Sequence, residues 1–173
     1  MTYKSIREAI KSHEGRTLFC LPSALLGEET PRAVFVTSEL KEIVDGPPWP
    51  TTWEGQRHAE LRALFDGFTE GDRITVGERP FEKDPRAIMA RTHPIKDEVW
   101  DFRSLQRKPG IRAFGRFSEP NTFIALTWNY REIVDWECEI KRCKAAWEKL
   151  FPDTPPFTGH NINEYITYNA EAV

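Results

Sequence analysis

The amino-acid sequence predicts an α+β domain, in which helices pack on an antiparallel sheet with a three-strand meander in the C-terminal half of the chain. Three runs of alternating apolar and polar residues within Val99–Trp128 predict the meander. Two segments with apolar residues at helical spacing predict the helices. The length of 173 residues and the 39% hydrophobic content are typical of a folded domain. We therefore expect one domain over 1–173, with an N-terminal helix and strand extension at 1–31, a core at 32–150 and a tail at 151–173.

The meander is predicted by runs that turn residues separate. The runs are Val99–Arg103, Ile111–Phe117 and Phe123–Trp128, with breaks at Lys108–Gly110 and Ser118–Asn121. Successive side chains of a strand point to opposite faces, so the middle strand should have an apolar face and a face that combines positive charge with an aromatic ring. The apolar face would carry Ile111, Ala113 and Phe117, and the charged face Arg112, Phe114 and Arg116. Arg103 of the first strand can join the charged face.

Shorter elements are expected before the meander. Apolar residues at helical spacing predict a helix over Thr2–Ser12, with Thr2 as a candidate N-cap and Gly15 just past the end. Candidate strands are Leu18–Leu21, Arg32–Val36, Asp72–Arg79 and Ala87–Ala90. A polar, proline-containing connection at Gly27–Pro31 separates the first two of these strands.

Two amphipathic helices are expected to pack on the sheet. The first follows a proline-rich stop, is capped by Thr51 or Thr52, and covers Thr52–Phe68. Its apolar side would carry Trp53, Arg57, Leu61, Leu64, Phe65 and Phe68, with His58 and Glu60 beside it on half-exposed surface. The second covers Glu132–Leu150, and its core stripe would be Ile133, Trp136, Ile140, Cys143, Trp147 and Leu150. In the tail, Asn161–Tyr168 is apolar enough to dock as a last short element.

Charge is distributed unevenly along the chain. The net charge is −3, but Trp100–Phe117 carries five basic residues and one acidic residue, so this segment has a net charge of +4 and the remainder −7. A basic patch on an acidic body predicts an anionic partner at one place. A second interpretation stays open, in which the strand arginines are solvated or paired with helix carboxylates.

Several classes of protein are not expected. Three cysteines, Cys20, Cys138 and Cys143, form no disulfide framework, and the N-terminus has no apolar signal core, so we expect a reduced cytoplasmic protein. Cys138 and Cys143 are five residues apart without a nearby histidine, which predicts no metal site, and no cofactor motif is present. The apolar run Thr17–Leu26 is interrupted by Pro22 and is too short to span a bilayer, so no membrane partner is expected.

Val99–Arg103 fits a W-E-[LF]-R strand motif, with Asp101 in place of the glutamate. This motif is typical of the RelE/HigB toxin superfamily, which the chain resembles, particularly its phage-derived HigB-like branch. Gly110–Phe114 is similar to the yRvfy strand and Phe123–Trp128 to the ivlLhgF strand. The resemblance covers roughly Arg32–Leu150 and implies a RelE/HigB-like architecture.

The family motif F-x-K-K-T-x3-P-x2-E-I-x2-A can be aligned without gaps from Trp128 to Cys143. Arg131 falls on the second lysine, and Glu139 and Ile140 on the Glu-Ile pair. The middle of the motif departs from the family pattern, with Tyr130 for the first lysine, Glu132 for the threonine and Trp136 for the proline.

The resemblance implies a metal-independent, ribosome-dependent mRNA endonuclease that a cognate antitoxin neutralises. Such an enzyme cleaves RNA by attack of a 2′-hydroxyl on the neighbouring phosphate, and guanidinium groups stabilise the charge that develops on the phosphate oxygens. The candidate catalytic residues are Arg103, Arg112, Arg116, Tyr130 and Arg131, and the candidate RNA-binding residues are Arg107 and Lys108. The catalytic residues would converge at one end of the sheet.

A non-enzymatic alternative is a phage or prophage-type protein-binding module that retains the fold and engages an unknown protein partner. The sequence pI near 5.9 favours this alternative, because a negative body opposes approach to a polyanionic ribosome. The basic strand segment favours the nuclease.

Overall fold

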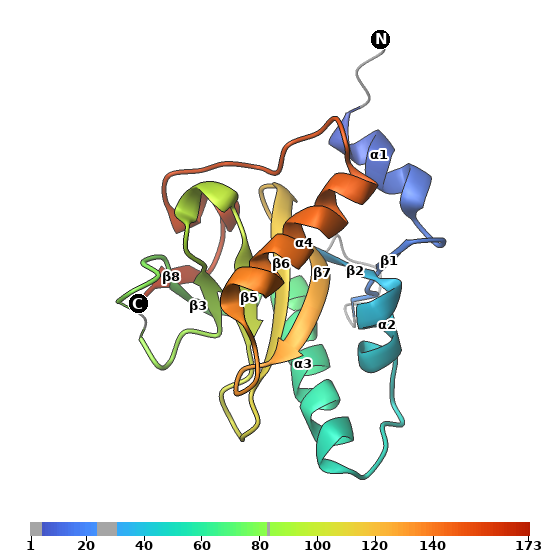
Figure 1. The fold of residues 1–173 in the computed structure, drawn as a ribbon, viewed down its shortest axis with the longest axis vertical. Coiled ribbons are helices and arrows are strands. Elements are labelled where there is room, and N and C mark those ends of the chain that lie inside the picture. The colour runs from blue at the N-terminus through green and yellow to red at the C-terminus, as the bar shows by residue number, and fades with distance from the viewer. Residues whose placement is uncertain (1–4, 24–30, 83) are drawn as a thin grey trace.

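The structure, a computed structural model, describes residues 5–23, 31–82 and 84–173. Within these residues, eight strands form one sheet in the order β1-β2-β7-β6-β5-β4-β3-β8 (Figure 1). The strands are β1 Leu18–Cys20, β2 Ala33–Thr37, β3 Ile74–Gly77, β4 Met89–Arg91, β5 Trp100–Arg103, β6 Ile111–Glu119, β7 Thr122–Tyr130 and β8 Ala170–Ala172. The helices are α1 Ile6–His13, α2 Ser38–Val44, α3 Trp53–Glu70, α4 Trp136–Leu150, α5 Ile162–Tyr165 and the 3-10 helix η1 Ile95–Asp97. The edge strands, β1 and β8, have three residues each.

The predicted meander is confirmed. β5, β6 and β7 are consecutive antiparallel neighbours, and their register places Arg103 opposite Arg112 and Ala113 opposite Trp128. The two predicted faces of β6 are also correct. Ile111, Ala113 and Phe117 belong to one hydrophobic core, whereas Phe114 belongs to the other.

The prediction of an antiparallel sheet is wrong, because the sheet is mixed. β2 runs parallel to β7, and β3 runs parallel to both β4 and β8. After β2 the chain passes through α2 and α3, so β3 begins on the far side of the meander from β2. Residue alternation predicts that a strand forms but not the direction of its neighbour, which the intervening helices decide here.

Helix ends follow local capping chemistry. Of the two candidate caps of α3, Thr51 and Thr52, the structure selects Thr52, whose Oγ1 accepts a hydrogen bond from the Gly55 N–H at 3.2 Å. Ser5 and Glu8 form a capping box on α1, so this helix begins at Ile6, while Thr2 lies outside the described residues. The second long helix begins at Trp136 instead of Glu132, because Asp135 is its N-cap.

Two hydrophobic cores lie on opposite faces of the sheet. In Figure 1, α4 crosses the front of the sheet and α3 lies behind it. On the α3 face, the helix contributes Leu61, Phe65 and Phe68 to the core. On the α4 face, the helix contributes Ile140, Cys143 and Trp147, and α1 adds Ile10. The beginning of the predicted α4 stripe is not core, because Ile133 is 74% exposed and Trp136 is 37% exposed.

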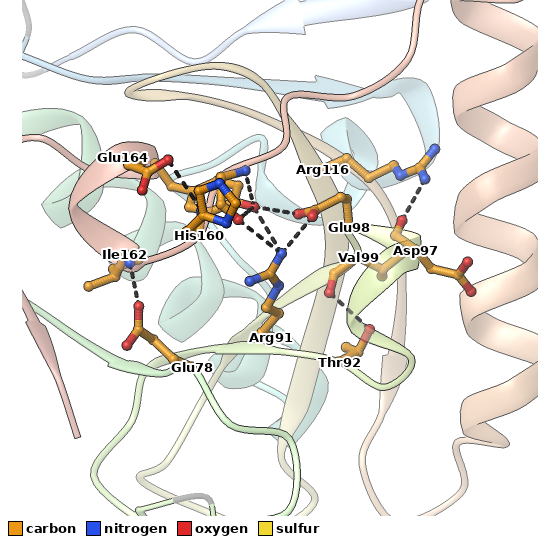
Figure 2. A network of polar contacts seen from close by, with 12 residues as sticks. Glu78, Arg91, Thr92, Asp97, Glu98, Val99, Arg116, His160, Ile162 and Glu164 are labelled. Carbon is orange, nitrogen blue, oxygen red and sulfur yellow. Dashed lines mark hydrogen bonds and ion pairs between the residues drawn. The ribbon is translucent and has the colours of Figure 1, made fainter.

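The C-terminal tail docks on the α3 face through a buried polar cluster. Arg91 Nη2 lies 2.5 Å from Glu98 Oε1, and Tyr165 Oη donates to Glu98 Oε2 at 2.6 Å. The backbone N–H of Gly159 donates to Tyr165 Oη at 2.6 Å. Figure 2 shows Arg91 pointing toward Glu98 beneath the tail segment that carries His160. The predicted last element is therefore α5, and β8 continues the sheet beyond it.

Removal of the Trp147 side chain is expected to lower the free energy of unfolding by about 3–5 kcal/mol, because a large aromatic group is lost from the α4 core. Trp147 is buried and packs against Phe151. Urea denaturation of Trp147→Ala tests this, with the exposed Cys138→Ser as a variant that should change stability much less. Equal midpoints for the two variants would show that α4 packs through another face.

The hydroxyl of Tyr165 is expected to stabilise the docked tail. Tyr165→Phe keeps the ring but leaves buried hydrogen-bonding groups of Glu98 and Gly159 without this partner. The free energy of unfolding should therefore fall by about 1–3 kcal/mol. The measurement is urea denaturation together with limited proteolysis of the tail. Tyr168→Phe, at an exposed tyrosine of the same tail, is the matched control. Identical stability of both variants would contradict the structural role of the hydroxyl.

Candidate nucleic-acid interface

A buried charged cluster lies on the α4 face of the two central strands. The register pairs Arg103 of β5 with Arg112 of β6, and Asp101 lies two residues earlier on the same face of β5. Asp101 Oδ2 lies 3.4 Å from Arg112 Nε and 3.8 Å from Arg103 Nε. Asp101 is 0% exposed and Arg112 is 3% exposed. One carboxylate therefore faces two guanidinium groups, which leaves the cluster with net positive charge.

Arg112 is held in an environment that disfavours its charge. Burial lowers the pKa of Arg112 to about 10, although the nearby Asp101 carboxylate acts in the opposite direction. Arg112 Nη1 donates to the backbone carbonyl of Ser104 at 3.2 Å and to its own neighbour Ile111 at 3.3 Å. Its Nε makes no hydrogen bond among the described residues and faces the Asp101 carboxylate at 3.4 Å. Arg112 therefore stays charged at neutral pH and adds positive electrostatic potential to this end of the sheet.

Gly110 brings the residues that follow β7 next to this cluster. The N–H of Arg131 donates to the Gly110 carbonyl at 2.7 Å, and the N–H of Gly110 donates to Glu132 Oε2 at 2.9 Å. A Cβ at Gly110 would lie 3.3 Å from the Ser104 carbonyl oxygen, so this close approach favours glycine. The loop before β6 and the exposed Arg131 thus meet above Arg112.

The loop between β5 and β6 is also tied to α3. Ser104 Oγ donates to Glu60 Oε2 at 2.7 Å, and Arg107 Nη1 donates to Gln56 Oε1 at 2.8 Å. Arg107 and Lys108 are exposed on this loop. We call the five positively charged residues at this end of the sheet the basic cluster. Its members are Arg103, Arg107, Lys108, Arg112 and Arg131.

Arg116 and Tyr130 do not join the basic cluster, so the expectation that all five candidate catalytic residues converge is wrong. Arg116 lies four residues beyond Arg112, roughly 13 Å along the strand. Its Nη2 donates to the Asp97 carbonyl at 2.5 Å, as Figure 2 shows, and its guanidinium lies 5.5 Å from the centre of the Trp147 ring. These contacts give Arg116 a structural role within the α4 layer.

Tyr130 lies on the opposite face from Arg112 because it pairs with Ile111, whose side chain faces α3. Its ring packs 5.5 Å from that of Trp53 and 5.3 Å from that of Trp128. Burial raises the pKa of Tyr130, with Glu54 acting in the same direction, so the phenol stays protonated at neutral pH. The interpretation of the strand arginines as solvated is also wrong for Arg112 and Arg116, which are both buried.

Two acidic residues of this site were not among the predicted site residues. Asp101 and Arg103 are two apart on a strand, so alternation alone predicts that they share a face. In the sequence, Glu132 is distinguished only by replacing the threonine of the family motif. Its contact with Gly110 depends on how two loops close, and no local pattern in the sequence reports that contact.

Comparison with known proteins gave no matching family model, no similar curated protein and no similar solved structure. In the part of the chain that the structure describes, no group of three or more histidine, cysteine, aspartate or glutamate side chains is placed to hold a metal ion. Within the same residues, no helix is long and apolar enough to cross a membrane.

Asp101→Asn is expected to lower the free energy of unfolding by about 3–5 kcal/mol, because Arg103 and Arg112 would lose their shared counter-charge in a buried position. Urea denaturation measures the effect. Asp45→Asn removes the carboxylate of an exposed pair with Lys41 and should cost much less. A fully stable Asp101→Asn protein would show that the two arginines do not depend on this carboxylate.

Proposed function

We propose that this chain is a metal-independent endoribonuclease of toxin type that cleaves mRNA at the ribosome. The observation that carries the proposal is the basic cluster, which gathers three of the predicted catalytic arginines and both predicted RNA-binding residues at one end of the sheet. Arg107, Lys108 and Arg131 are exposed, so they can contact a phosphate chain directly. Arg103 and Arg112 lie beneath them and share the single carboxylate of Asp101, so they add positive electrostatic potential.

The chemistry that fits this cluster is internal transesterification. The 2′-hydroxyl attacks the adjacent phosphorus, the bond to the 5′-oxygen of the next nucleotide breaks, and a 2′,3′-cyclic phosphate and a 5′-hydroxyl remain. Arg131 is assigned to the phosphate oxygens, where negative charge develops in the transition state. Glu132, an exposed carboxylate at the same place, is assigned to accept the proton of the 2′-hydroxyl. The leaving 5′-oxygen takes up a proton from water, and Glu132 returns its proton to the solvent. Tyr130 is not given a proton-transfer role, because its side chain lies on the other face.

The order of elements supports the resemblance to the RelE/HigB superfamily. From β2 to α4 the chain passes through a strand, two helices, the short strands β3 and β4 with η1, the three-strand meander and a final helix. The order therefore matches that of strand, helix, meander and helix apart from the insertion of β3, β4 and η1. A cognate antitoxin would neutralise such an enzyme by covering Arg131 and the loop that carries Arg107 and Lys108. No cofactor is required for the proposed reaction, since the transferred proton and the leaving group are both supplied by the RNA.

A protein-binding module is the second candidate, and one surface favours it. A groove of about 480 Å³ lies between α2, β7 and the segment before α4, and it is lined by three exposed or partly exposed apolar residues together with the buried Ile43. Its apolar lining is formed by Ile43, Trp128, Tyr130 and Ile133. Trp53, which packs on Tyr130, is itself about half exposed. Apolar surface of this kind is typical of protein contacts.

Arg131→Ala is expected to reduce mRNA cleavage about 100-fold or more, because a charged donor to the transition-state phosphate is lost. Arg131 is exposed, so its substitution should leave the thermal midpoint nearly unchanged. The measurement is primer extension on a reporter mRNA in a reconstituted translation system, with and without chelator. Arg7→Ala, which removes an exposed arginine from α1, is the matched control.

Arg112 needs a different test, because its burial makes Arg112→Ala a stability variant as well. Arg112→Lys keeps the buried positive charge but loses the planar fork of donors that contacts Asp101 and the Ser104 carbonyl. Its cleavage activity should therefore lie between those of Arg112→Ala and the wild type. Absence of cleavage by the wild-type protein on translating ribosomes, together with harmless overexpression in cells, would exclude the nuclease and leave the protein-binding candidate.

A further inference from the structure

A second hollow lies on the α4 face, away from the basic cluster. This cleft has a volume of about 760 Å³ and is formed by the loop after β3, the connection from β4 to η1, and the first half of α4. The residues that matter for its chemistry are Phe81, His93, Lys96, Trp136, Lys141 and Lys144. A volume of this size is typical of sites for small molecules and for single groups of larger ligands.

Aromatic side chains from different elements are exposed in this cleft. Phe81 is 81% exposed, and its ring lies 4.8 Å from that of His93. Trp136 at the start of α4 is 37% exposed, and its ring lies 5.6 Å from that of Phe114. Leaving large aromatic rings in water is unfavourable, so their presence in one hollow indicates a ligand with an apolar, flat surface.

The charges at the cleft favour an anionic ligand. Lys141 Nζ lies 2.5 Å from Glu137 Oε1, and Lys144 Nζ lies 2.8 Å from Asp97 Oδ1. Lys96 is exposed and adds a third positive charge, so the cations lining the cleft outnumber the carboxylates. The pair of Lys141 with Glu137 is exposed and contributes little stability, so Lys141 can turn toward a phosphate at low cost. The pair of Lys144 with Asp97 is partly buried and keeps Lys144 at the wall of the cleft.

The cleft shares its sheet face with Arg103 and Arg112 of the basic cluster. Trp136 packs on Phe114, and Phe114 lies directly opposite Asp101 in the β5–β6 register. Arg112 is two residues from Phe114 on the same face of β6. A single extended ligand that touches Arg131 can thus continue over the beginning of α4 toward Phe81.

We infer that the cleft is a nucleotide subsite, in which a base of single-stranded RNA stacks on Phe81 and Trp136 while the lysines bind neighbouring phosphates. This inference rests on the proposed function, because it assigns the cleft to a flanking part of the same RNA. Combined stacking and cationic contacts are the general solution for binding single strands without sequence preference. A peptide would also satisfy the aromatic residues, but continuity with the basic cluster favours a phosphate chain.

The test measures binding of a short oligoadenylate labelled with fluorescein, by fluorescence anisotropy, against an abasic oligomer with the same backbone charge. The wild-type protein should bind the oligoadenylate more tightly than the abasic oligomer. Phe81→Ala should weaken binding of the oligoadenylate about tenfold or more and leave binding of the abasic oligomer unchanged, since stacking alone is lost. Tyr168→Ala, at an exposed tyrosine outside the cleft, should change neither affinity.

Different results separate the subsite from the nuclease. Stacking at Phe81 without mRNA cleavage by the wild type would support the subsite and reject the nuclease. Cleavage with equal affinity of wild type and Phe81→Ala for the oligoadenylate would reject the subsite and leave the cleft to a peptide. Because Phe81 is so exposed, its substitution should leave the fold intact, which circular dichroism checks. Lack of binding of either oligomer by the wild type would overturn the inference.

Discussion

The burial of charge on the two central strands is the constraint on which the rest of the structure depends. β5 and β6 lie in the interior of an eight-stranded sheet that helices cover on both faces, so any ionised side chain on them is removed from water. Arg112 is held by Asp101 and by backbone carbonyls, because no bulk water reaches it. The backbone at Gly110 packs against Arg112 and is hydrogen-bonded to Arg131. The same loop therefore covers the buried arginine and brings the exposed charges of the basic cluster together.

Much of the fold was predictable, because residue alternation and capping act locally. The meander and the faces of β6 were predicted correctly, and Thr52 was one of the two candidate caps of α3. The parallel pairing of β2 with β7 could not be derived, since it depends on the path of the chain through α2 and α3. For the site, the shared face of Arg103 and Arg112 followed from period-two geometry. The burial of Arg103 and Arg112, and the position of Tyr130 on the opposite face, could not be predicted, because both depend on what packs over each face.

The turn before β5 couples the two layers of the protein. Asp97 acts on the α4 side, where its carbonyl accepts from Arg116 and its carboxylate pairs with Lys144. The next residue, Glu98, acts on the other side, where it binds Arg91 and Tyr165 (Figure 2). Glu98 has a positive φ of 52°, an uncommon conformation for a residue with a side chain. Asp97 and Glu98 therefore link the wall of the cleft to the docked tail. An ordered tail is expected to favour an ordered cleft wall.

The short edges of the sheet have a consequence for behaviour at high concentration. A long sheet normally presents unpaired backbone donors and acceptors along both outer strands, and these can recruit further copies of the same chain. Here β1 and β8 each offer only three residues, and β8 carries the charged Glu171 at its centre. The long strands, β6 and β7, lie in the middle, where both of their edges are already paired. The molecule thus keeps its most aggregation-prone backbone out of reach of a second copy.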